Sequence, residues 1–171
     1  FAVGCVRAGI HAADGYPGTP STETIDKGLS QAQDRITVGW SVNEAVAVSV
    51  GVGHAMAGRD CVVTMKIPGL YQACDAFTSV SCYMQPKGAL VYYIASDFTP
   101  SSTQHVIDPK YLFKSCFVPV FEPRTHQEMH EAAGLAADIS RTMRPSRMTS
   151  TFTPATVSSR KNPTTSADRS R

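Results

Sequence analysis

The sequence predicts an α/β fold with an open, mainly parallel sheet and helices on both faces. Short apolar runs rich in β-branched residues alternate along the chain with longer stretches of helical periodicity. The runs are continuously apolar and do not alternate with polar residues, which is typical of strands buried on both faces of a parallel sheet. The 171 residues are enough for one domain with a substantial core.

The expected strands and helices follow one another in the order that such a sheet requires. Strands are expected at 35–40, 61–65, 89–95 and 116–121, with a weaker first strand near 10–16. Helices are expected at 20–31, 42–57, 70–83 and 125–141, and another in the opening residues "FAVGCVRAGI". Ligands in open sheets of this kind bind where the strands end and the following helices begin.

A change in composition divides the chain into a domain at 1–140 and a tail at 141–171. The net charge of +2 hides this division, because the tail holds seven Lys or Arg against one Asp. The remaining nine basic and thirteen acidic residues give the body a charge near −4. The tail is rich in Ser and Thr and its apolar residues follow no period, so we expect it to be disordered. A basic arm for acidic lipid or nucleic acid and a non-native end are the other two interpretations.

Composition also limits the class of protein. No apolar run is long and pure enough to span a bilayer, and the acidic body does not indicate nucleic-acid binding. The five cysteines form no Cys-x-x-Cys pair and most lie beside apolar residues, which indicates free thiols in a reducing, cytoplasmic compartment. Their spacing fits neither an iron–sulfur cluster nor a zinc site, so we expect no metal ligands in this chain.

The stretch "GYPGTPSTE" at 15–23 predicts a tight turn that leads into a helix. Its two glycines allow the turn, Thr19 is a good N-cap, and Pro20 suits the first helical position. The free N–H groups of that helix start, with the hydroxyls of Thr19 and Ser21, could bind a carboxylate or a phosphate. A well-capped helix without a ligand is the alternative interpretation.

Glu44 begins a long apolar stretch, "EAVAVSVGVGHAMAG", in which histidine is the only other polar ionisable residue. The spacing Ser41-x-x-Glu44 fits a capping box, in which the glutamate bonds the Ser41 N–H. A carboxylate at the partly desolvated mouth of a closely packed helix could instead share a proton with a ligand nitrogen. Spacing alone favours the capping box and leaves the second interpretation open.

Two further segments carry polar residues at expected strand ends. In "VTMKIPGL" (63–70), Lys66 is placed to meet an anion, although an exposed turn lysine is the commoner case. The Pro-Gly pair of that segment would let the backbone at Gly69 approach a ligand closely. The loop "SDFTPSSTQHVIDPK" (96–110), which includes Gln104, is longer than most connections and so favours a functional loop.

Taken in order, four blocks of this sequence resemble a known enzyme family over about residues 1–140. The family is the thiamine-diphosphate-dependent 2-oxoacid:ferredoxin oxidoreductases, which include indolepyruvate ferredoxin oxidoreductase, and the similar part is their N-terminal, pyrimidine-binding domain. The blocks are "DGYPGTPSTE" at 14–23, "WSVNEAVA" at 40–47, "VTMKIPGL" at 63–70 and "SDFTPSSTQ" at 96–104. Four ordered blocks at family-like spacing are more specific than any one of them, and they reverse the preference at Glu44.

The resemblance implies a function for several residues. Glu44 is implied to bond the pyrimidine ring of thiamine diphosphate and to share a proton with it, which prepares the cofactor for decarboxylation of a 2-oxoacid. Thr19 is implied to face both the substrate and the cofactor. The other implied contacts are Lys66 and Gly69 with the cofactor and Ser21 and Gln104 with the substrate.

The resemblance also implies partners that this sequence does not itself supply. In the family, a diphosphate-binding domain or subunit holds the diphosphate and Mg²⁺. The complex also contains a second oxidoreductase subunit, and electrons pass through the iron–sulfur clusters of the complex to ferredoxin. Coenzyme A accepts the acyl group. The sequence contains neither the "GDG" magnesium motif nor cluster cysteines, so it would be half of an active site and inactive alone. The segment "HVIDPK" departs from the family pattern, which leaves the 2-oxoacid open.

Two other classes of protein compete with this interpretation, and the four ordered blocks argue against the second of them but not against the first. The first is a truncated domain of the same fold that binds a partner or an anion and catalyses nothing. The second is a flavodoxin-like α/β module in which Glu44 only caps a helix.

Overall fold

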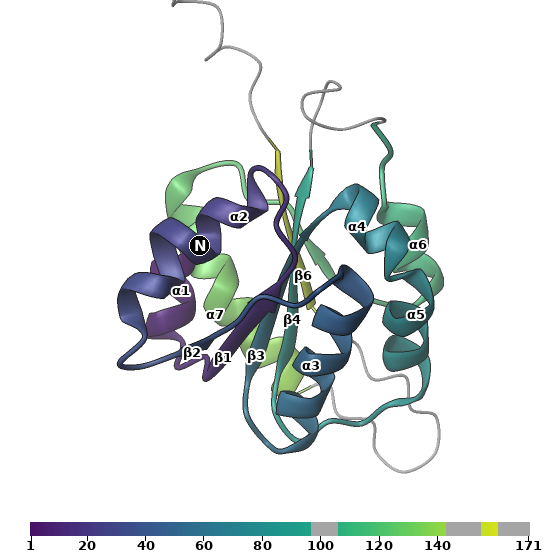
Figure 1. The fold of residues 1–171 in the computed structure, drawn as a ribbon. Coiled ribbons are helices and arrows are strands. Elements are labelled where there is room, and N and C mark those ends of the chain that lie inside the picture. The colour runs from purple at the N-terminus through teal and green to yellow at the C-terminus, as the bar shows by residue number, and fades with distance from the viewer. Residues whose placement is uncertain (97–105, 143–154, 161–171) are drawn as a thin grey trace, which may run out of the picture.

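A single parallel sheet with helices on both faces forms the protein (Figure 1). The computed structural model describes residues 1–96, 106–142 and 155–160. The sheet has six strands in the order β2-β1-β3-β4-β6-β5, and every neighbouring pair is parallel. The predicted fold class, an open parallel α/β sheet, is confirmed.

The elements alternate along the chain as the sequence predicts. The strands are β1 (Ala12–Gly15), β2 (Thr37–Val38), β3 (Cys61–Lys66), β4 (Leu90–Ser96), β5 (Val120–Phe121) and β6 (Ala155–Arg160). The helices are α1 (Ala2–Arg7), α2 (Ser21–Glu23), α3 (Glu44–Met56), α4 (Ile67–Gln72), α5 (Cys74–Tyr83), α6 (Lys110–Ser115) and α7 (His126–Thr142). A π-helical turn η1 (Thr24–Gly28) and a 3-10 turn η2 (Leu29–Ala32) continue α2.

Several elements differ from their expected extent. The helix expected at 20–31 is only briefly α-helical before it becomes π and then 3-10. The helix expected at 70–83 begins three residues earlier and is broken at Ala73 into α4 and α5. The strand expected at 116–121 shrinks to β5, because Phe117 takes a left-handed φ of 55° that interrupts extended backbone.

Side chains of the central strands alternate between two cores, one on each face of the sheet. Val63 of β3 and Tyr92 of β4 belong to the core under α3, α4, α5 and α6, whereas Val62 and Val91 belong to the core under α1, η1, η2 and α7. Because both faces are covered, successive residues of β3 and β4 are all buried. This explains why these strands read as continuous apolar runs.

The segment at 155–160 corrects the predicted disorder of the tail 141–171. These residues form β6, which pairs with β4 on one side and with β5 on the other. The run "ATVSSR" contains β-prone Thr and Val, and its backbone satisfies hydrogen-bonding groups of both neighbours. Helix α7 also extends past the expected domain boundary at 140. Residues 143–154 and 161–171 lie outside the described part of the chain.

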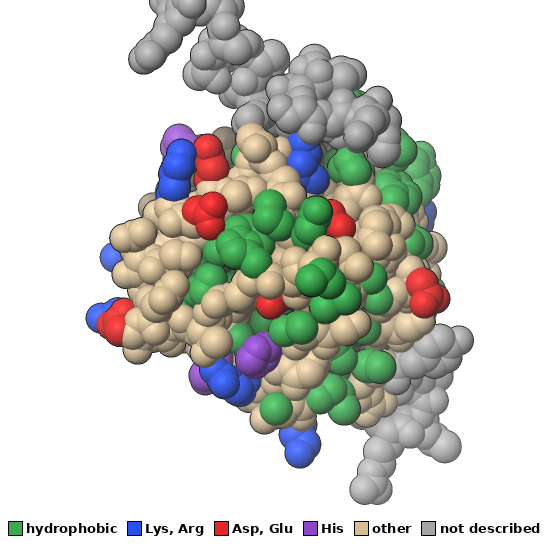
Figure 2. Space-filling model, in the orientation of Figure 1, with side chains coloured by type: hydrophobic (Ala, Val, Ile, Leu, Met, Phe, Trp, Pro, Cys, Tyr) green, Lys and Arg blue, Asp and Glu red, His purple; other side chains and the backbone are tan. Residues whose placement is uncertain are grey.

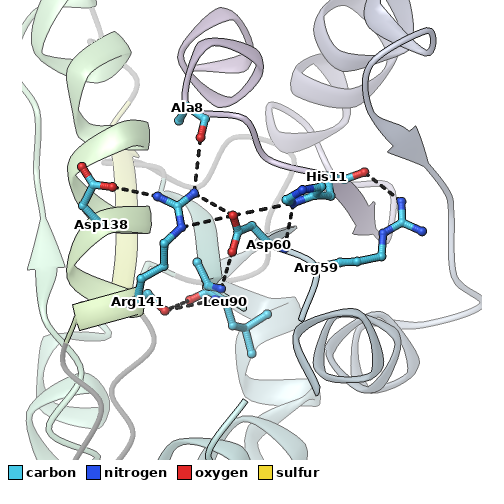
Figure 3. A network of polar contacts seen from close by, with 9 residues as sticks. Ala8, His11, Arg59, Asp60, Leu90, Asp138 and Arg141 are labelled. Carbon is cyan, nitrogen blue, oxygen red and sulfur yellow. Dashed lines mark hydrogen bonds and ion pairs between the residues drawn. The ribbon is translucent and has the colours of Figure 1, made fainter. Parts of the chain in front are cut away.

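A polar network closes the amino-terminal edge of the sheet (Figure 3). The Asp60 carboxylate accepts hydrogen bonds from Arg141 Nη2 at 2.6 Å and from the Ala89 N–H at 2.6 Å. Arg141 also donates to the Ala8 carbonyl, so α7, α1 and the start of β3 are tied together. Burial alone would raise the pKa of Asp60, but the hydrogen bonds from Arg141 and Ala89 outweigh it and lower that pKa. The Asp60 N–H donates to His11 Nδ1, which also lies 3.6 Å from the Asp60 carboxylate.

Candidate active site

The carboxyl edge of the sheet, opposite this network, holds the sequence-predicted site residues that the structure describes. The turn after β1 carries Thr19 and Ser21, Lys66 is the last residue of β3, and Gly69 lies in α4 directly behind it. Glu44 is the first residue of α3. Parallel strands bring their carboxyl ends to one edge, so the topology gathers segments that are distant in sequence. Gln104 lies outside the described residues.

Helix α3 begins with Asn43 and not with the expected capping box. The Asn43 side chain accepts a hydrogen bond from the Val46 N–H at 2.9 Å, which is the usual N-cap contact. The Ser41 hydroxyl instead donates to Asp14 Oδ1 at 2.6 Å. The capping-box interpretation is therefore wrong, because asparagine is an equally good cap and lies next to the first helical residue. Glu44 is left without a capping function.

The Glu44 carboxylate lies directly against Gly69 of α4. A Cβ atom built on Gly69 would stand 2.4 Å from Glu44 Oε1 and 2.8 Å from Cδ, so the absence of a side chain at 69 is what lets the carboxylate fit there. A second contact joins the two helices, in which the Ala45 N–H donates to Gln72 Oε1 at 3.2 Å. Among the described residues, the Glu44 carboxylate has no hydrogen bond and no ion pair, and its side chain is half-buried. It is free to meet a donor from outside this chain.

The turn after β1 does not form the predicted anion-binding helix start. Pro20, and not Thr19, occupies the N-cap of α2, and it makes no side-chain cap bond. The Ser21 hydroxyl is buried and donates to the Gly18 carbonyl at 2.5 Å, while the Gly18 N–H donates to Thr22 Oγ1. These bonds close the turn internally. Thr19 is exposed on its surface, where its hydroxyl has no hydrogen-bond partner among the described residues.

Lys66 is buried at the end of β3 and not exposed in a turn. Its aliphatic stem packs beneath Gly18, where an added Cβ would stand 3.0 Å from Lys66 Cγ. The lysine thus supports the turn that presents Thr19. Lys66 is thus buried at the same edge of the sheet as Glu44, and the expectation of an exposed turn lysine is wrong.

Asp14 is a buried carboxylate at this edge that sequence reasoning missed. It is 7% exposed at the end of β1 and, besides the Ser41 hydroxyl, bonds the Gly15 N–H. Burial is the main reason why the pKa of Asp14 is raised above its ordinary value. The sequence could have indicated this residue, because Asp14 lies inside an expected buried strand and a buried carboxylate requires a hydrogen-bond or charge partner.

Exposed hydrophobic side chains occur in the turn after β1, in the loop before α3, on α3 and on α4. They are Tyr16, Trp40, Val42, Val46, Met56 and Tyr71. Figure 2 shows hydrophobic side chains spread over the face that contains α3 and the loop leading into it. Val42, two residues before Glu44, is 80% exposed, which is unusual for an apolar side chain next to a polar site. This face has the character of a surface that a second domain or subunit covers.

Neither a metal centre nor a membrane-spanning helix is found in the described residues. No group of three or more His, Cys, Asp and Glu side chains in these residues could hold a metal ion. Within the same residues, no helix has both the length and the apolarity needed to cross a membrane.

Comparison with solved structures defines the class of this fold. A thiamine diphosphate-dependent 4-hydroxybenzoylformate decarboxylase from Rhodococcus jostii RHA1 matches 93% of the chain and 29% of its own, with a TM-score of 0.69 and 17% identity. A 2-oxoglutarate:ferredoxin oxidoreductase from Magnetococcus marinus matches 94% of the chain and 28% of its own, with a TM-score of 0.62 and 15% identity. The chain therefore has the α/β fold found in thiamine-diphosphate-dependent enzymes.

Within that class, sequence comparison identifies the chain as a homologue of part of indolepyruvate oxidoreductase subunit IorA. The subunit from Archaeoglobus fulgidus is 35% identical over 145 residues, which are 82% of this chain and 23% of the relative. The subunit from Pyrococcus abyssi is 36% identical over 133 residues, 77% of this chain and 20% of the relative. The chain thus spans less than a quarter of the length of these curated relatives. No protein-family model matches it.

Proposed function

We propose that this chain forms the pyrimidine-binding half of a thiamine-diphosphate-dependent 2-oxoacid oxidoreductase. The complete enzyme would act in the cytoplasm, convert a 2-oxoacid such as indolepyruvate to an acyl-CoA, and pass electrons through iron–sulfur clusters to ferredoxin. The uncommitted carboxylate of Glu44, held against Gly69 at the carboxyl edge of the sheet, is the observation that carries this proposal.

The residues at this edge fit the pyrimidine part of the cofactor. A ring with a basic nitrogen needs an acceptor or proton-sharing group beside an apolar wall. Exposed Trp40 lies in the loop that leads into Glu44, and exposed Tyr71 lies two residues after Gly69 in α4. Thiamine diphosphate, when bound, supplies the nucleophilic carbon and the electron sink for decarboxylation. Glu44 would hold a proton at the ring nitrogen, Gly69 would leave room for the carboxylate, and the exposed Thr19 hydroxyl would face the substrate.

The other half of the site would come from outside the described residues. The diphosphate and Mg²⁺ would be held by a further domain or subunit. The exposed apolar face over α3 would then be buried against that domain (Figure 2). Water would be excluded from Glu44 by this contact, which strengthens a proton shared between the carboxylate and a ring.

A partner-binding module of the same fold without catalytic activity is the second candidate. The exposed apolar face supports it as well as it supports the enzyme, since an interface is needed in both cases. The two candidates differ in what they require of Glu44, because a module that only docks does not need a free carboxylate.

The test is thiamine diphosphate binding, with Mg²⁺, to this chain combined with a diphosphate-domain partner, followed by decarboxylation of aryl 2-oxoacids. Glu44→Gln keeps the size of the side chain but removes the shared proton, so the rate should fall by about 10²-fold or more with an unchanged melting temperature. Glu131→Gln is the matched control and should keep the native rate, because Glu131 is exposed on α7, which covers the opposite face of the sheet. Near-native turnover in Glu44→Gln would show that proton sharing is not the function of this residue.

A further inference from the structure

The loop between β2 and α3 is fastened to β1 at three points. The Gly39 N–H donates to the Ala13 carbonyl at 2.9 Å, and the Ser41 N–H donates to the Gly15 carbonyl at 2.9 Å. Between these two bonds, the Ser41 hydroxyl donates to the Asp14 carboxylate at 2.6 Å. The backbone bonds continue the pairing of β2 with β1, whereas the bond from Ser41 to Asp14 depends on two particular side chains.

The surroundings of Asp14 are shaped around its carboxylate. A Cβ atom on Gly39 would stand 3.0 Å from Asp14 Oδ2, so the loop comes this close only because residue 39 has no side chain. Among the described residues, Asp14 has no ion pair, although only 7% of its surface is exposed. An ionised carboxylate in such a place costs stability unless hydrogen bonds offset the cost. A requirement other than stability would explain why an acidic residue stands there.

Few titratable groups face Asp14. From α3 it is approached by half-buried His54, and from β3 by the buried Cys61 thiol. Burial raises the pKa of Asp14, while the Ser41 hydroxyl, the Gly15 N–H and His54 oppose that rise. Burial likewise raises the pKa of the Cys61 thiol, and the charge of Asp14 adds to this effect. Cys61 therefore stays protonated wherever Asp14 titrates.

We propose that Asp14 is a positioning residue, which through Ser41 fixes the loop that directs Glu44 out of the start of α3. Ser41 is followed by Val42, by the extended cap residue Asn43 and then by Glu44. Once Ser41 is fixed, only Val42 and Asn43 separate it from Glu44. These two residues then determine where α3 begins and in which direction the Glu44 side chain points. The inference rests on the proposed function of Glu44, but the anchoring of the loop can be measured without it.

Trp40 reports on this loop directly. It is the only tryptophan of the chain, it is 39% exposed, and it lies between the two anchored residues Gly39 and Ser41. Its fluorescence emission and its quenching by acrylamide should therefore respond both to the charge of Asp14 and to the loss of the Ser41 bond. Both can be recorded on the intact chain across a pH titration.

The expected results concern two variants and two controls. In the native chain, Trp40 emission should show a transition at a pH above the ordinary range of an aspartate, and Asp14→Asn should abolish it. Ser41→Ala should move this transition to higher pH and raise acrylamide quenching about twofold, since the bond that lowers the Asp14 pKa is lost. Ser41→Thr keeps the hydroxyl and should restore native behaviour. Ser49→Ala removes an exposed hydroxyl that bonds only the Ala45 carbonyl, and should change nothing.

Folding can be checked independently. Asp14→Asn should melt at the native temperature or above it at neutral pH, since the amide carries no buried charge. A Trp40 transition that persists unchanged in Asp14→Asn, or quenching in Ser41→Ala equal to that in Ser49→Ala, would overturn the proposal.

The consequence for the active site is measured in the assembled enzyme. Ser41→Ala should raise the thiamine diphosphate concentration for half-saturation about tenfold with a smaller effect on the rate at saturation. If Ser41→Ala changes Trp40 but leaves half-saturation native while Glu44→Gln impairs it, Asp14 does not position Glu44. If Ser41→Ala changes both readouts and Glu44→Gln changes neither, the anchoring stands and the proposed function of Glu44 fails.

Discussion

Replacing Gly69 by alanine should stabilise the fold and damage the site at the same time. Gly69 lies inside α4, where its backbone is helical and alanine is the better helix former by about 0.5–1 kcal/mol. The new Cβ would meet Glu44 Oε1 at 2.4 Å, and ordinary contact begins at 3.4 Å, so the carboxylate must retreat by the difference of 1.0 Å. The atoms in conflict are Cγ, Cδ and Oε1 of Glu44, so the half-buried side chain must rotate from its Cα–Cβ bond outward to make room.

A displacement of about 1 Å in a catalytic group can reduce the rate by about 10²-fold. We therefore expect Gly69→Ala to melt at the native temperature or a few degrees above it. In the assembled enzyme of the proposed function, it should lose most of the cofactor-dependent decarboxylation. Gly134→Ala is the matched control, because Gly134 lies in α7 on the other face and an added Cβ makes only a 3.8 Å contact with Ala8. It should gain the same stability and keep full activity.

Two outcomes would refute this reasoning. If Gly69→Ala binds cofactor and turns over like Gly134→Ala, the position of the Glu44 carboxylate does not matter for function. If it unfolds at a much lower temperature, the contact with Glu44 is rigid, and that side chain does not rotate to make room. Thermal denaturation by circular dichroism and cofactor half-saturation together distinguish these cases.

Two predictions concern stability alone. Asp60→Asn should lower the free energy of unfolding by about 2 kcal/mol at pH 7, because the charged bonds from Arg141 are lost. Because the pKa of Asp60 is lowered in the folded state, this stabilisation is present above the unfolded-state pKa near 3.9 and disappears as the pH falls through the folded-state pKa. The melting temperatures of the native chain and of Asp60→Asn should therefore converge in strong acid. A constant difference between them would contradict the stabilising function given to the Asp60 carboxylate. Tyr92→Phe should raise the free energy of unfolding by about 1 kcal/mol in urea denaturation, since the buried hydroxyl has no hydrogen-bond partner among the described residues; a loss of stability would mean that it is satisfied.

The regular part of the fold could be predicted from the sequence because burial on both faces leaves a strong pattern. The runs that form β3 and β4 are apolar at nearly every position, and this needs no knowledge of tertiary contacts. The short edge strands β2 and β5 could not be delimited, because their few pairing residues depend on neighbours in the sheet. Strand β6 was missed for the same reason, since its polar sequence acquires a structure only between β4 and β5.

The site was only partly predictable for a different physical reason. Gly69 and Glu44 were recognised through their blocks, but their contact joins α3 and α4, two helices that strand β3 separates in the chain. Asn43 caps α3, whereas the Ser41 hydroxyl donates to Asp14 of β1. Local spacing cannot reveal a partner 27 residues away in the chain.

The use of Asn43 as the cap separates the folding of α3 from the chemistry at its first residue. A glutamate that capped its own helix could be exchanged only at the expense of the domain, whereas Glu44 makes no capping bond. On the proposed function, a substitution at 44 would convert a catalytic half-site into a silent docking domain with its architecture unchanged. Descendants of such a chain could drift between enzyme subunit and scaffold without passing through an unfolded intermediate.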